Sequence, residues 1–155
     1  GFGRWLGQVA RNPGQVKLSG GGDLKDFDPT ALGQLGDFAW PQDKAFAAAF
    51  RPKLMGLAAT YYLAAKGKNG QPLDPVARFH LGNGARLEHL NWLGDTSEKG
   101  LKESAGLMVN YLYDIDSIEA RHEAFANKGE VAASPAVTRQ FREFSTNLTK
   151  EARHV

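Results

Sequence analysis

The first apolar residues of the chain recur at helical spacing. They occupy every third or fourth position: Phe2, Trp5, Leu6 and Val9. The turn residues Asn12-Pro13-Gly14 follow, so the pattern predicts an amphipathic helix over residues 2–11. Residues 15–41 hold a triple glycine, prolines and scattered apolar positions, which predict a loop-rich segment with one helical turn near Pro29.

A second apolar stretch follows Pro52, a residue type that suits the first position of a helix. Its apolar residues keep a helical period: Leu54, Met55, Leu57, Ala58, Tyr61, Tyr62 and Ala65. Gly67 and Asn69-Gly70 then end the pattern. We therefore expect a helix that begins at Pro52 and ends before Gly67.

The pattern becomes strand-like on both sides of Asn83-Gly84. This dipeptide is favoured in two-residue hairpin turns, where both positions need positive φ. The sequence thus predicts a β-hairpin formed by residues 76–82 and 85–92. In that hairpin His80 and His89 would share one face as diagonal neighbours.

Polar residues 96–104 predict a short helix with Asp95 or Thr96 as its cap. Residues 106–113 are rich in strand-forming types and predict a third strand.

Residues 114–128 show helical spacing, and Ser134-Pro135 is a start signal for a last helix. One apolar face of that last helix is formed by Val137, Phe141, Phe144 and Leu148. Helices mixed with a few strands predict an α+β fold.

Length and composition indicate one compact domain. The 155 residues are 42% apolar and 23% charged, as in soluble globular proteins. The net charge of +2 gives no reason to expect a nucleic acid or an anionic membrane as partner. The absence of cysteine excludes disulfides and thiolate metal sites, and no apolar run is long enough to span a bilayer.

His80 is a candidate catalytic residue, although its pattern alone favours a structural role. Gly82, Asn83 and Gly84 leave the backbone beside it open to a ligand, but a hairpin turn explains the same residues. A metal site with His89 would need a third ligand of known spacing, and none is found, so no metal is predicted.

Asn110 within an apolar strand is a second candidate. A buried amide needs hydrogen-bond partners, and a structural bridge satisfies that need as well as a substrate does.

Three blocks of the chain resemble the malonyl-CoA decarboxylase family, in that family's order. They are residues 74–85 (DPVARFHLGNGA), Asn91-Trp92 with Asp95 and Ser97 close by, and residues 106–113 (GLMVNYLY). The opening GFGRWL is similar to the segment that directly follows a Ser-Pro-x-Pro motif in this family.

The resemblance implies that residues 1–155 are the C-terminal portion of a catalytic domain with a GCN5-related acetyltransferase-like fold, a mixed sheet with flanking helices. An upstream helical domain and a serine-bearing segment would then lie outside this chain, and none of its own serines stands in a Ser-Pro-x-Pro motif. The resemblance also implies a homo-oligomer without cofactor, and we expect it in a bacterial cytoplasm.

The implied reaction is the decarboxylation of malonyl-CoA to acetyl-CoA, with His80 as the family's catalytic histidine. Imidazole exchanges protons near neutral pH, so His80 could protonate the enolate or orient the upstream serine. We expect Tyr113, Asn110 and Asn83 to contact the substrate. Arg4, at the start of the first helix, is a candidate for the pyrophosphate of CoA.

Two alternatives stay open. An acyl-CoA-dependent N-acyltransferase of the same fold would use His80 as a base. A noncatalytic fragment would instead pack its apolar faces against a partner chain.

Overall fold

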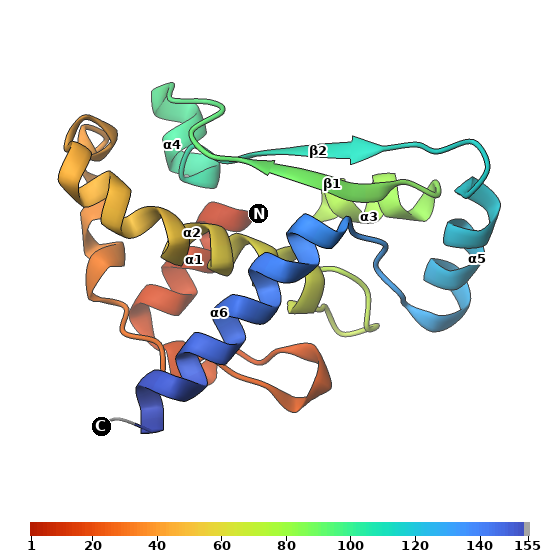
Figure 1. The fold of residues 1–155 in the computed structure, drawn as a ribbon, viewed down its shortest axis with the longest axis horizontal. Helices are drawn as coiled ribbons and strands as arrows, with labels where there is room; N and C mark the ends of the chain where they lie inside the picture. Colours follow the sequence, from red (N-terminus) through yellow and green to blue (C-terminus); the bar gives the residue numbers. More distant parts are fainter. Residues whose placement is uncertain (154–155) are drawn as a thin grey trace.

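The computed structural model describes residues 1–153 and has a mixed α+β architecture that is mostly helical (Figure 1). Its helices are α1 (Phe2–Arg11), α2 (Lys44–Ala64), α3 (Pro75–Gly82), α4 (Glu98–Ser104), α5 (Ile118–Lys128) and α6 (Pro135–Arg153). Four short 3₁₀ helices lie before α2, at Pro13–Gln15, Ser19–Gly21, Thr30–Gly36 and Trp40–Gln42. Strands β1 (Arg86–Asn91) and β2 (Met108–Leu112) form a two-stranded antiparallel sheet.

The predicted first helix is confirmed. α1 buries Phe2, Trp5, Leu6 and Val9 on one face, as their spacing requires. The loop-rich segment that follows is also confirmed, with the 3₁₀ turns Thr30–Gly36 beginning directly after Pro29.

The predicted start of the second helix is wrong. α2 begins at Lys44, where the carboxylate of Asp43 accepts a hydrogen bond from the Phe46 amide at 3.1 Å. This cap and the alanine-rich turn behind it start the helix, and Pro52 lies exposed inside α2.

The predicted hairpin around Asn83-Gly84 is wrong in its first strand, because residues 75–82 form helix α3, whereas the predicted strand 85–92 is confirmed as β1. Asp74 caps α3 through a 2.9 Å hydrogen bond from the Ala77 amide, and Pro75 fills the first position. Asn83 has a φ of −92° rather than the positive value of a hairpin turn, and only Gly84 is left-handed, with a φ of 92°. The dipeptide therefore ends a helix.

The predicted third strand is confirmed as β2, but its partner is β1. Leu87 pairs with Tyr111, His89 with Asn110 and Leu90 with Val109, and a bulge interrupts the register between Leu87 and His89. α4 lies between the strands in sequence.

α4 is capped by Ser97, not by Asp95 or Thr96. The Ser97 hydroxyl accepts a hydrogen bond from the Gly100 amide at 3.1 Å, while the Asp95 carboxylate accepts one from the Ser97 amide at 3.0 Å.

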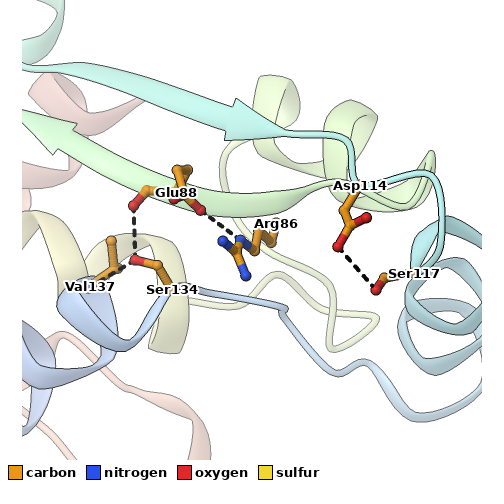
Figure 2. Close-up of polar contacts among 6 residues, drawn as sticks. All are labelled: Arg86, Glu88, Asp114, Ser117, Ser134 and Val137. Carbon is orange, nitrogen blue, oxygen red and sulfur yellow. Dashed lines mark hydrogen bonds and ion pairs between the residues drawn. The ribbon is translucent and has the colours of Figure 1, made fainter.

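α5 begins at Ile118, later than predicted, because residues 114–117 form a turn. The Ser117 hydroxyl donates to the Asp114 carboxylate at 3.4 Å in this turn (Figure 2).

The start of α6 is confirmed at Pro135. The Ser134 hydroxyl accepts from the Val137 amide at 3.3 Å and donates to the Glu88 carbonyl at 2.8 Å (Figure 2). Ser134 therefore caps α6 and fastens it to β1, where Arg86 and Glu88 form an ion pair at 2.6 Å.

α2 forms the centre of the core, and α6 crosses it at close range (Figure 1). The buried Gly56 permits this approach, because a Cβ at that position would run into the Phe144 ring. α1 packs on α2 through aromatic contacts of Phe2 and Trp5 with Tyr61. Among residues 1–153, no helix is long and apolar enough to cross a membrane.

Candidate active site

His80 lies in the last turn of α3, and its half-buried ring faces the end of β2. Its Nδ1 atom is 2.7 Å from the phenolic oxygen of Tyr113, the residue directly after β2. The ring also stacks on Tyr111, with centroids 4.3 Å apart and planes 20° from parallel. Tyr111 and Tyr113, two positions apart in the chain, thus hold the imidazole by a ring contact and by a hydrogen bond.

The bond to Tyr113 has a chemical consequence for His80. Either Nδ1–H donates to the phenolic oxygen, or the phenol donates to Nδ1, according to the imidazole tautomer. No hydrogen-bond partner of Nε2 is found within residues 1–153. Nε2 is therefore the atom that can exchange a proton with a ligand.

The first turn of α3 is anchored by Asp74, which is only 8% exposed. One carboxylate oxygen caps α3, and the other accepts a 3.0 Å hydrogen bond from the hydroxyl of Tyr61 on α2. The same oxygen lies against the start of α1, since a Cβ built on Gly1 would be 2.5 Å from it. Three helices thus meet at one buried carboxylate.

The phenols around this carboxylate are held neutral. Burial raises the pKa of Tyr61, Tyr62 and Tyr111, and the negative charge of Asp74 raises each pKa further. The charge of Asp74 therefore raises the pKa of Tyr111, the residue on which the His80 ring stacks.

The other predicted site residues lie apart from this contact. Asn110 belongs to the opposite face of β2, where its amide oxygen accepts from the Asn91 side chain at 3.0 Å. His89, which pairs with Asn110, shares that face, so the predicted neighbourhood of His80 and His89 is wrong. Asn83 is the exposed C-cap of α3, three residues beyond His80.

Arg4 is exposed on the first turn of α1. The carboxylate of Asp74 already lies at the start of this helix, which makes the α1 amides less favourable for a second anion. The substrate contacts predicted for Arg4, Asn110 and Asn83 stay predictions.

No group of three potential metal ligands from His, Cys, Asp or Glu occurs in the part of the chain that the structure describes.

Sequence reasoning missed Asp74 and Tyr111 as members of the site. The Asp74-Pro75 pair is a helix-start signal and could have identified α3. Tyr111 and Tyr113 are two positions apart in a strand, so a shared face was readable as well. The sequence did not show which residue faces these two tyrosines, because only the tertiary fold brings His80 to them.

Comparison with known proteins identifies the family to which this chain belongs. The family described as Malonyl-CoA decarboxylase C-terminal domain matches residues 1–151. The mitochondrial malonyl-CoA decarboxylase of Anser anser anser is 37% identical over 108 residues, which are 70% of this chain and 21% of that protein.

Solved structures agree. The malonyl-CoA decarboxylase of Agrobacterium vitis is 48% identical with a TM-score of 0.80, over 91% of this chain and 33% of that chain. The enzyme from Rhodopseudomonas palustris is 48% identical with a TM-score of 0.79, over 90% of this chain and 31% of that one.

The fold is thus that of one part of the solved malonyl-CoA decarboxylases. The chain belongs to the malonyl-CoA decarboxylase family. It spans about a fifth of the curated relative and about a third of the solved chains.

Proposed function

We propose that the full-length protein converts malonyl-CoA to acetyl-CoA and carbon dioxide, with His80 at the reacting centre. The observation that carries this proposal is the contact of His80 with Tyr113 and Tyr111 in a chain of this family. The contact supports a catalytic role because it fixes the imidazole and leaves one ring nitrogen for the substrate.

The reaction needs a proton donor but no oxidant. The bond between the α-carbon and the carboxylate breaks, carbon dioxide leaves, and the electron pair forms an enolate on the thioester oxygen. Protonation of the α-carbon then gives acetyl-CoA. In this proposal the Nε2 atom of His80 delivers the proton or orients a serine from outside the chain, and Tyr113 holds the ring.

The rest of the catalytic domain would complete the site. Large apolar side chains remain exposed around His80, among them Phe79 at 65% and Tyr113 at 42%. Such surface is normally covered by protein, and the solved relatives' chains are about three times as long as the matched part. We propose that the serine-bearing segment and further strands of a GCN5-related acetyltransferase-like sheet cover this face, with an upstream helical domain before them.

The start of α1 lies beside α3. Gly1 lies against Asp74 and Tyr61, at the anchored end of the helix that carries His80.

Incubation of the full-length protein with malonyl-CoA tests the reaction. We expect acetyl-CoA and carbon dioxide in equal amounts without an added acceptor. Turnover that requires an added amine would instead identify an N-acyltransferase and contradict the proposal.

A further inference from the structure

We infer that Asp74 is a positioning residue that sets the place of His80 by fixing the first turn of α3. This inference rests on the proposed function of His80. Asp74 itself faces three helices and is not proposed to touch the substrate.

Asp74 and Ser134 differ from the other side-chain caps of the fold, because both are buried and both bond a second element. Asp43 caps α2 and Ser97 caps α4, but both are exposed, and each accepts a hydrogen bond only from its own helix. Asp74 is buried, and its second oxygen bonds the hydroxyl of Tyr61 on α2. Its contacts therefore fix α3 to another element as well as starting it.

Because Asp74 is buried, its carboxylate depends on these hydrogen bonds. A buried carboxylate is costly unless its oxygens accept hydrogen bonds. Within residues 1–153 the one ion pair is that of Arg86 with Glu88, so no salt bridge offsets the charge of Asp74. The Ala77 amide and the Tyr61 hydroxyl are the donors that hold the carboxylate, and their directions fix where α3 begins.

α3 transmits this position to His80. The helix has eight residues, a length at which a helix depends on its cap and its packing rather than on its own stability. His80 lies six residues after Asp74, about 9 Å along the axis at a rise of about 1.5 Å per residue. A tilt or shift of the first turn would therefore move the imidazole away from Tyr113 and Tyr111.

Three substitutions in the full-length protein separate positioning from simple stability. Asp74→Ala removes both contacts of the carboxylate. Asp74→Asn can keep both, because the amide oxygen accepts from Ala77 and the amide nitrogen can donate to the Tyr61 oxygen. Tyr61→Phe removes only the bond to α2 and keeps the packed ring. Asp43→Ala is the matched control, since it removes an aspartate cap from a helix that does not carry His80.

We expect Asp74→Ala to lower kcat by about 10- to 100-fold, because a misplacement of about 1 Å can cost about that much, with KM changed less than about threefold. Tyr61→Phe should lower kcat less, by about three- to tenfold. Asp74→Asn should restore kcat to within about threefold of wild type, and Asp43→Ala should leave it unchanged. Equal kcat values for Asp74→Ala and Asp43→Ala, or no rescue by asparagine, would overturn the inference.

A second measurement does not depend on activity. With histidine-selective ¹⁵N labelling, the imidazole signals of His80 should shift in Asp74→Ala toward those in Tyr113→Phe and stay in place in Asp43→Ala. Unchanged imidazole signals of His80 in Asp74→Ala would overturn the positioning role of Asp74. An inactive wild-type protein would instead refute the proposed function, and the NMR comparison would still decide this inference. Should Asp74→Ala not fold, Tyr61→Phe and Asp74→Asn decide it by the same two measurements.

Discussion

The Nδ1 atom of His80 lies 2.7 Å from the phenolic oxygen of Tyr113, although 33 residues separate the two in sequence. α3 supplies the histidine and the end of β2 supplies the tyrosine. The bond depends on the packing of α3 beneath the strands (Figure 1). Removing it therefore tests the fold and the proposed site together.

Tyr113→Phe removes this bond and keeps the ring. In the full-length protein we expect kcat to fall by about tenfold or more, since a neutral hydrogen bond contributes about 0.5–1.5 kcal/mol and its loss also frees the imidazole. The melting temperature should change little because Tyr113 is 42% exposed.

Tyr62→Phe is the control for that change. Its ring is buried, and no hydrogen bond of its hydroxyl is found in the described part of the chain. Equal effects of the two substitutions on kcat would contradict a special role for the Tyr113 hydroxyl.

Gly56→Ala tests the crossing of α2 and α6. The added Cβ would collide with the Phe144 ring, and overpacking of a core typically costs about 1–3 kcal/mol. We expect a lower free energy of unfolding by chemical denaturation. Gly33→Ala should change it little, because nothing lies within 4 Å of a Cβ at that position. A stability of Gly56→Ala equal to wild type would contradict the described crossing.

The neutral tyrosines predict a loss of stability at alkaline pH. Their pKa values are raised above the ordinary value of about 10, so above pH 10 the unfolded chain releases phenolic protons that the folded chain keeps. Their contribution is therefore fully present below about pH 10 and is lost as the pH rises further.

Denaturant unfolding between pH 8 and pH 11 measures this loss. We expect a smaller decline in Tyr62→Phe, which has one such phenol fewer. An identical decline in wild type and Tyr62→Phe would contradict the raised pKa of Tyr62.

Local signals predicted the elements whose ends coincide with strong caps or turns. The spacing of Phe2, Trp5, Leu6 and Val9 identified α1, and Ser134-Pro135 identified α6, because in both cases one face meets the core at a regular period. The residues of β2 were recognised by type, and its partner was not, since strand pairing is set by distant segments.

The errors have physical causes as well. Asn83-Gly84 suits a helix end and a hairpin turn alike, and the cap at Asp74 decides between them. His80 could be chosen only through the family resemblance, because its partners Tyr111 and Tyr113 are assembled by the tertiary fold.

The rate of acetyl-CoA formation from malonyl-CoA by the full-length protein and its His80→Ala variant tests the central claim most directly. General acid catalysis typically contributes about 10²- to 10⁴-fold, so we predict a loss of that size with an unchanged melting temperature, and no loss for the control His89→Ala on the other sheet face. Decarboxylation by His80→Ala at the wild-type rate would contradict the account.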